Sequence, residues 1–129
     1  MTQAKLQLKA IGINHVVIWV GDLARSRAFY MDLFGMTVAH ESATTCFLWC
    51  GENHQLALFD STRRGGGVTS NQELNHLAFL MELTSYEDTK ACLEADGLSV
   101  EARDGDPDCI YINDPDGHRL QVLYKGYDG

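Results

Sequence analysis

The stretch Ile13-Asn14-His15 recurs in the second half of the chain as Leu74-Asn75-His76. The two histidines stand 61 residues apart, and the similarity continues beyond them. Further matching positions, at a spacing that drifts only to 64 residues, are Gly35 with Gly97, Cys46 with Cys109, and His54 with His118. Because similarity at a nearly constant spacing reports a repeated structural unit, the chain is predicted to consist of two equivalent modules.

Each module is predicted to form a strand, a helix and three further strands. Asp22 and Gly35 are placed to begin and end the first helix, and Ser85 and Gly97 do the same for the second. Strands are expected at about 13–20, 37–41, 44–49 and 55–59, and again at about 74–81, 100–102, 109–113 and 119–124. The predicted fold class is therefore α+β, with two tandem βαβββ modules at about 11–60 and 74–125, joined by a linker at 61–73 within one domain spanning 1–129.

Composition narrows the function classes. In a chain of 129 residues, a net charge of −8 argues against nucleic acid and against an anionic membrane surface as partners, because both need a basic face. No apolar run approaches the roughly 20 residues of a membrane span, and the first eight residues lack the apolar block of a signal peptide, so a cytoplasmic protein is expected. The four cysteines lack CxxC spacing and are predicted to be reduced thiols.

Four side chains at matching strand positions form the candidate site. His15 and His76 occupy equivalent places in the first strand of each module, and Ala57 and Gln121 occupy equivalent places in the last. If the modules pack about a pseudo-two-fold axis, these four side chains converge in one cleft, where two imidazoles and one amide oxygen could bind a metal. The plainer alternative is that duplication alone explains both histidines and that Gln121 is merely hydrogen-bonded.

The remaining histidines are expected to have other roles. His54 and His118 flank hairpin turns and are predicted to lie on the surface. His40 alternates along a short strand and could line the cleft.

The chain resembles the vicinal oxygen chelate superfamily. The resemblance is carried by four stretches: Asn14-His15, the helix with Phe29-Tyr30 and Leu33-Phe34-Gly35, Asn75-His76, and the run Asp114–Leu120 (DPDGHRL). It covers nearly the whole chain and implies a glyoxalase-like, open mixed sheet that contains a cleft. The superfamily includes glyoxalase I, extradiol dioxygenases, fosfomycin-resistance thiol transferases, methylmalonyl-CoA epimerases and bleomycin-binding proteins.

The resemblance also implies a ligand set. The family's metal ligands fall on His15, His76 and Gln121, where the last is usually a glutamate, and the optional fourth ligand falls on Ala57. The implied cofactor is a divalent metal (Fe, Mn, Ni or Zn), or none in metal-free members. The strand tyrosine of the fosfomycin branch falls on Tyr111, which is the candidate catalytic residue, a hydrogen-bond donor or weak acid near the site.

The neutral Gln121 bears on the reaction. An amide leaves a divalent ion and two imidazoles at a charge of +2, whereas a carboxylate would leave +1, so metal binding is expected to be weaker. Gln121 cannot act as a base, which favours dioxygenase or lyase-type chemistry on a small molecule with vicinal oxygens over glyoxalase chemistry. The acidic segment 101–108 argues against a phosphonate such as fosfomycin.

Two other functions remain open. The first alternative is a metal-free binding protein of the bleomycin-resistance type, which would sequester a cationic ligand. The second is a structural or regulatory domain whose cleft is filled by side chains. Exposed sheet edges and the family resemblance predict a homodimer in either case, so that His15 meets His76 of its own chain or of the neighbour.

Overall fold

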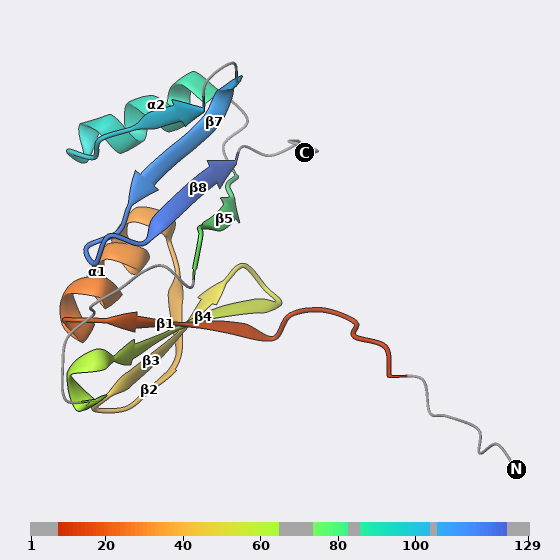
Figure 1. The fold of residues 1–129 in the computed structure, drawn as a ribbon, viewed down its shortest axis with the longest axis vertical. Coiled ribbons are helices and arrows are strands. Elements are labelled where there is room, and N and C mark those ends of the chain that lie inside the picture. Colours follow the sequence, from red (N-terminus) through yellow and green to blue (C-terminus); the bar gives the residue numbers. More distant parts are fainter. Residues whose placement is uncertain (1–7, 65–73, 83–85, 104–105, 124–129) are drawn as a thin grey trace, which may run out of the picture.

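The computed structural model describes residues 8–64, 74–82, 86–103 and 106–123 (Figure 1). The first module contains β1 (His15–Val20), α1 (Leu23–Phe34), β2 (Thr37–Glu41), β3 (Thr45–Cys50) and β4 (His54–Asp60), followed by a short 3-10 helix, η1 (Ser61–Arg64). The second contains β5 (Leu77–Leu80), α2 (Tyr86–Ala95), β6 (Glu101–Arg103), β7 (Asp106–Asn113) and β8 (Arg119–Leu123). The α+β class and the repeated βαβββ order are confirmed, whereas most of the predicted linker, 65–73, lies outside the described residues.

The repeat extends to the pairing of strands. The two sheets have the orders β1-β4-β3-β2 and β5-β8-β7-β6. In each sheet the first and last strands of the module pair in parallel, and the other pairs are antiparallel. Val17 lies opposite Ala57, and the repeat-equivalent Ala78 lies opposite Gln121. The two candidate positions on the last strands are therefore equivalent in three dimensions.

Helix α1 begins and ends where the sequence predicts. The extended backbone of Asp22 (φ −142°) allows its side chain to accept a hydrogen bond from the backbone N–H of Arg25 at 3.0 Å. At the other end, Gly35 adopts φ +67°, a left-handed conformation that favours glycine, and its N–H bonds to the carbonyl of Met31. The two caps fix the length of the helix and hence the position of its buried residue Tyr30.

One hydrophobic core joins the two modules. The inward sides of both sheets contribute to a single cluster of buried residues that includes Ile18, Leu58, Ile110 and Val122. In Figure 1, α1 (orange) lies between the strands of the two modules. Its side chains Tyr30 and Phe34 contact Phe79 on β5, with ring centroids 6.4 and 5.0 Å apart.

The other face of β1 is not covered by this core. Val16, Ile18 and Val20 point toward the core, while His15, Val17 and Trp19 alternate with them and are exposed. The residues before β1 run out from the body of the molecule, and Leu8, Ile11 and Ile13 on this arm are 65–98% exposed (Figure 1).

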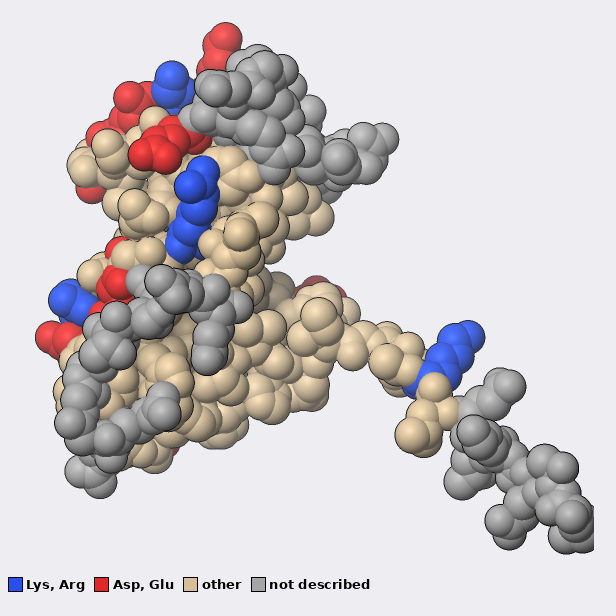
Figure 2. Space-filling model, viewed as in Figure 1, with Lys and Arg blue, Asp and Glu red and all other residues tan. Residues whose placement is uncertain are grey.

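The acidic side chains on the face seen in Figure 2 gather over α2.

Two local predictions need correction. β5 is shorter than the predicted 74–81, because Asn75 and His76 precede the strand. β7 begins at Asp106 rather than 109, since its pairing with β6 extends to Arg103 opposite Asp106. No helix among the described residues is long and apolar enough to cross a membrane. Of the cysteines, Cys46, Cys50 and Cys92 are free thiols.

Candidate metal and ligand site

The two Asn-His pairs that open the modules have the same local geometry. The Nδ1 atom of His15 lies 2.7 Å from Oδ1 of Asn14, and Nδ1 of His76 lies 2.7 Å from Oδ1 of Asn75. Because an amide oxygen can only accept a hydrogen bond, Nδ1 of each imidazole carries the proton. Nε2 is then left with its lone pair, which is the form in which histidine binds metals.

The asparagines are therefore candidate site residues that sequence reasoning missed. The Asn-His dipeptide is visible in both repeats, where it indicates duplication and carries part of the family resemblance, but the sequence alone assigns no role to the asparagine. Its chemical signal is an acceptor directly before each histidine that can orient the ring. A hydrogen-bond partner of this kind commonly fixes both the tautomer and the orientation of a metal-binding imidazole.

The second sheet brings three of the predicted residues together. Tyr111 on β7 lies opposite Gln121 on β8. The ring of His76 meets the ring of Tyr111 edge-on, with centroids 5.6 Å apart. Gln121 and Tyr111 are only 7% and 6% exposed, so their polar groups are held in a sheltered environment.

The first sheet places His15 on an aromatic surface. Its ring lies 5.5 Å from that of Phe47 on β3, which in turn lies opposite Ala57. His40 stacks on Phe47 at 4.2 Å, so it lies on the same surface, as the sequence suggested it could. The described contacts of His15, to Asn14 and Phe47, are all within its own module. The structure therefore presents the predicted ligand set in two parts, one on each sheet.

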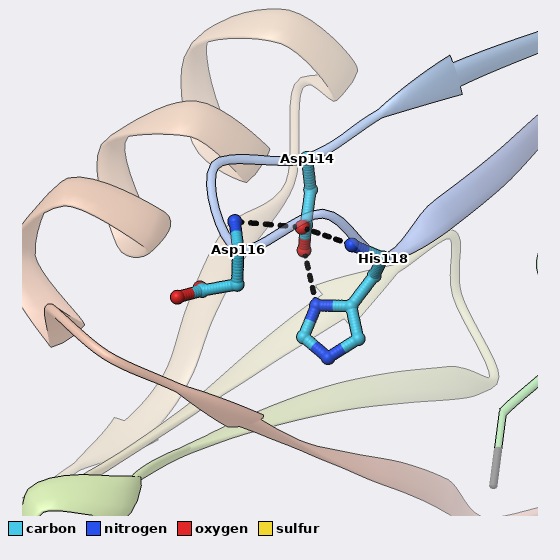
Figure 3. Close-up of side chains that lie close together, drawn as sticks. All are labelled: Asp114, Asp116 and His118. Carbon is cyan, nitrogen blue, oxygen red and sulfur yellow. Dashed lines mark hydrogen bonds and ion pairs between the residues drawn. The ribbon is translucent and has the colours of Figure 1, made fainter. Parts of the chain in front are cut away.

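A second cluster of polar residues lies in the turn between β7 and β8. Asp114, Asp116 and His118 each offer a ligand atom within 4.8 Å of the others (Figure 3). The Oδ1 atom of Asp114 accepts the backbone N–H groups of Asp116 and His118 at 2.9 and 2.8 Å, and Gly117 completes the turn with φ +86°. The sequence predicted this turn correctly from the order Asp-Pro-Asp-Gly.

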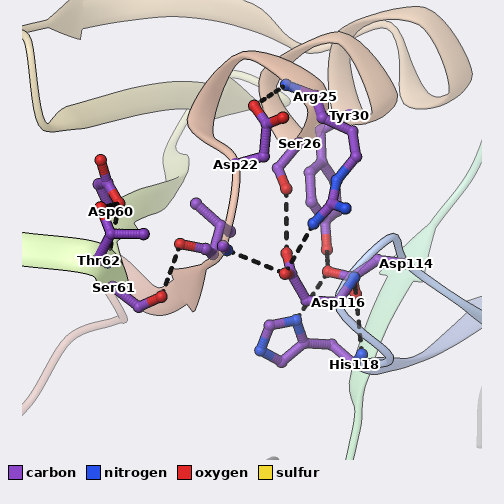
Figure 4. Close-up of polar contacts among 12 residues, drawn as sticks. Asp22, Arg25, Ser26, Tyr30, Asp60, Ser61, Thr62, Asp114, Asp116 and His118 are labelled. Atoms are coloured by element: carbon purple, nitrogen blue, oxygen red, sulfur yellow. Dashed lines mark hydrogen bonds and ion pairs between the residues drawn. The ribbon is translucent and has the colours of Figure 1, made fainter. Parts of the chain in front are cut away.

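The same turn fastens the two modules together (Figure 4). Oδ2 of Asp114 accepts hydrogen bonds from the buried hydroxyl of Tyr30 at 2.5 Å and from Nδ1 of His118 at 2.8 Å. The carboxylate of Asp116 accepts further hydrogen bonds from three groups of the first module, the N–H of Gly21, Nη2 of Arg25 and the hydroxyl of Ser26. We refer to Tyr30, Asp114, Asp116 and His118 with these three partners as the inter-module clasp.

The clasp is a structural contact rather than a metal site. Each of the four carboxylate oxygens of Asp114 and Asp116 already accepts at least one hydrogen bond, so a cation would have to displace these donors. His118 is 5% exposed, so its predicted surface position is wrong. The sequence pattern could not show that a histidine beside a hairpin turn would fold back onto Asp114. His54, by contrast, is exposed as predicted.

The clasp shifts the ionisation of its members. Burial by itself would raise the pKa of Asp114, but hydrogen bonds from His118 and Tyr30 outweigh it and lower that pKa below its usual range. Burial likewise would lower the pKa of His118, but the hydrogen bond and the charge of Asp114 raise it. Burial and the charge of Asp114 raise the pKa of Tyr30, so its hydroxyl stays protonated and donates.

The sequence is similar to a known protein family and to proteins of known activity. The family model described as Glyoxalase/Bleomycin resistance protein/Dioxygenase superfamily matches residues 12–122. The glutathione transferase FosA of Serratia marcescens is 27% identical, with 85% of this chain and 78% of that protein covered. The metallothiol transferase FosB of Staphylococcus haemolyticus is 28% identical, with 86% and 81% covered.

Solved structures share the fold. A lactoylglutathione lyase from Agrobacterium tumefaciens superposes with a TM-score of 0.71 at 24% identity, covering 92% of this chain and 98% of that one. The fosfomycin resistance protein FosX from Listeria monocytogenes has a TM-score of 0.71 at 18% identity, with 89% and 91% covered. At this level of identity the structural similarity establishes the architecture and leaves the reaction open.

Proposed function

The chain belongs to the Glyoxalase/Bleomycin resistance protein/Dioxygenase superfamily, and from that premise we propose that it is a divalent-metal-dependent enzyme acting on a small molecule with neighbouring oxygen atoms. His15, His76 and Gln121 would hold the metal. The observation that carries the proposal is the matched pair of Asn-His hydrogen bonds, which leaves Nε2 of both histidines free to bind a cation.

The donor set fits a divalent transition metal. Two imidazole nitrogens suit Fe, Mn, Ni or Zn, and the amide oxygen of Gln121 adds a neutral third donor. Gln121 lies beside Tyr111, and both are buried on the face that also holds His76. Ala57, 0% exposed and without a donor, leaves the equivalent position of the first sheet unable to contribute a fourth ligand.

A bound divalent cation would supply Lewis-acid polarisation of a substrate oxygen. The side chains around it would then position the substrate and control protons. Gln121 cannot take up or release a proton in the reaction. Tyr111 lies on β7, the second strand from β5 and on the same face, and its hydroxyl can donate a hydrogen bond to substrate. Dioxygenase-type reactions, and lyase-type reactions in which a group other than the third ligand moves the proton, do not require proton transfer by Gln121. The same holds for thiol transfer of the kind named for the two transferase relatives.

Assembly would complete this site. β1 and β5 stand at the ends of their four-stranded sheets, and Val17, Trp19 and Leu80 on these strands are 41%, 38% and 67% exposed. Exposed edges with apolar side chains favour pairing with another chain. We propose a homodimer in which these edges are covered, so that His15 meets His76 of its own chain or of the partner.

Metal content tests the proposal. The freshly purified protein is expected to contain about one divalent metal per chain, and His76→Ala to lose it. His54→Ala removes an exposed histidine outside the site and serves as the matched control. Asn75→Ala keeps all three ligands but removes the acceptor that orients His76, and is expected to weaken metal binding by about 10- to 100-fold. Content below about a tenth per chain that added Fe, Mn, Ni or Zn fails to restore would contradict a metal site.

One alternative function is a metal-free binding protein. It is favoured by the neutral charge of Gln121 and by Ala57, which has no donor atom for a metal. In that case a ligand would raise the melting temperature with EDTA present. For the enzyme, stabilisation by a small oxygen-rich ligand requires the metal, so the same thermal-shift measurement separates the two functions.

A further inference from the structure

We propose that Arg119 binds an anionic group of the substrate, a carboxylate or a phosphonate, beside the candidate metal site; a phosphonate here would overturn the expectation drawn from the acidic segment 101–108. The inference rests on the proposed function and narrows its substrate class to small molecules that carry an oxyanion next to the oxygens that approach the metal.

Arg119 lies on the same face as the predicted ligands of the second module. It is the first residue of β8 and stands two positions before Gln121, so the two side chains project to the same side of the sheet. Its guanidinium carbon Cζ lies 4.0 Å from the centroid of the Tyr111 ring. His76 meets the same ring edge-on at 5.6 Å. The face therefore presents a row of three side chains, His76, Tyr111 and Arg119, with Gln121 beside it.

Arg119 differs from Arg25 and Arg27 in the kind of group that its guanidinium contacts. The protein carries a net charge of −8. Arg25 and Arg27 form ion pairs with Asp116 and Glu41. Within the described part of the chain, the recorded partner of the exposed Arg119 guanidinium is a neutral ring instead of a carboxylate.

The contact with Tyr111 prepares the guanidinium for an oxyanion. With Cζ 4.0 Å from the ring centroid, the ring covers one side of the guanidinium, and the N–H groups that do not face the ring can donate to a ligand. Two parallel N–H groups match the two oxygens of a carboxylate or phosphonate. The ring also restricts the rotamers of the side chain, so less entropy is lost on binding. A cationic ligand would be repelled at this position.

Glu101 limits how much negative charge the face accepts. It is exposed on β6 and lies opposite Tyr111, the residue whose ring the Arg119 guanidinium covers. The guanidinium is therefore about one strand spacing, roughly 5 Å, from the position of Glu101, well within the Debye length at 0.1 M salt. Glu101 opposes an anion at this position, and Glu101→Gln is expected to tighten anion binding by at least about twofold.

The test uses three probes that differ in one group: glycolate, hydroxymethylphosphonate and the neutral glycolamide. Their dissociation constants are measured by calorimetry on full-length wild type, Arg119→Gln and Lys90→Gln, each with and without added metal. Lys90→Gln is the matched control, because it removes the same charge from the exposed side of α2. Arg119→Gln is expected to weaken anion binding by about 10- to 100-fold, as loss of a charge-assisted hydrogen bond does, and to change glycolamide binding by less than twofold.

The two anions identify the group that Arg119 binds. If glycolate loses more affinity in Arg119→Gln, Arg119 binds a carboxylate; if hydroxymethylphosphonate loses more, it binds a phosphonate. Arg119→Lys should recover part of the lost affinity, because lysine keeps the positive charge but lacks the two parallel N–H groups. Equal anion affinities of Arg119→Gln and Lys90→Gln overturn the proposal. Equal binding of anions and glycolamide by the wild type also overturns it.

Two further readouts separate the possible failures. If Arg119 only packs on Tyr111, Arg119→Gln lowers the melting temperature without changing the preference for anions over glycolamide, and that result counts against the proposal. Metal content is measured on the same samples. Absence of metal from every variant contradicts the proposed enzyme, and the role of Arg119 is then decided by the metal-free titrations.

Discussion

Removing the hydroxyl of Tyr30 should destabilise the protein by uncoupling its two modules. The hydroxyl belongs to α1 in the first module and donates at 2.5 Å to Oδ2 of Asp114 in the second. Tyr30 is 0% and Asp114 5% exposed, so water cannot replace the lost donor. Tyr30→Phe keeps the ring contacts with Phe34 and Phe79, and the loss is therefore one charge-assisted hydrogen bond.

Such a bond contributes about 1.5–3 kcal/mol to the free energy of unfolding. For a domain of this size the melting temperature should fall by about 5–12 °C. Urea unfolding followed by circular dichroism gives the free-energy change, with an unchanged m-value showing that the denatured state is the same.

A double-mutant cycle isolates the contact. Asp114→Asn removes the charge that Tyr30 bonds to, so Tyr30→Phe should cost at least about 1 kcal/mol less in the Asp114→Asn background than in the wild type. Additive costs, or a Tyr30→Phe change below about 0.5 kcal/mol, would show that the clasp does not hold the modules together.

Three further predictions concern pH, metal affinity and assembly. The pKa of Asp114 is lowered, so the stability that its carboxylate provides is present above about pH 4 and is lost as the pH falls through the lowered pKa. The pKa of His118 is raised, so the stability that its imidazolium provides is complete below about pH 6.5 and is lost as the pH rises through the raised pKa. Urea midpoints should therefore be highest near pH 5–6, and the alkaline decline should be absent in His118→Asn. Gln121→Glu should strengthen divalent-metal binding by at least about tenfold in competition with a chelating dye, since it lowers the charge of the site by one unit. Trp19→Lys, on the exposed edge strand β1, should convert a dimer to a monomer in light scattering, and a monomeric wild type at micromolar concentration would contradict the proposed assembly.

Features determined by local sequence were predictable. The ends of α1 follow from Asp22 and Gly35, because a cap depends only on residues a few positions away. The repeat correctly indicated equivalent modules, since a duplicated hydrophobic alternation imposes the same register on both; that each module forms its own four-stranded sheet was not predicted. For the same reason the spacing of the repeat was enough to place Ala57 and Gln121 at matching positions of β4 and β8.

Features determined by distant contacts were not predictable. The Asp-Pro-Asp-Gly pattern indicates a turn, but Tyr30 lies 84 residues from Asp114, and no local pattern reports that they meet. The burial of His118 follows from the same contact. The asparagines before the two histidines were visible, yet their role depends on side-chain rotamers that place Oδ1 at 2.7 Å from Nδ1.

The most direct test of the central claim is the position of the bound metal. Crystals grown or soaked with Mn²⁺ or Zn²⁺ should show one anomalous-difference peak per site, about 2.0–2.2 Å from Nε2 of His15, Nε2 of His76 and Oε1 of Gln121. The same map shows whether His15 comes from the same chain or from a partner. A peak at Asp114, Asp116 and His118 instead, or no peak in metal-saturated crystals, would contradict the proposed site.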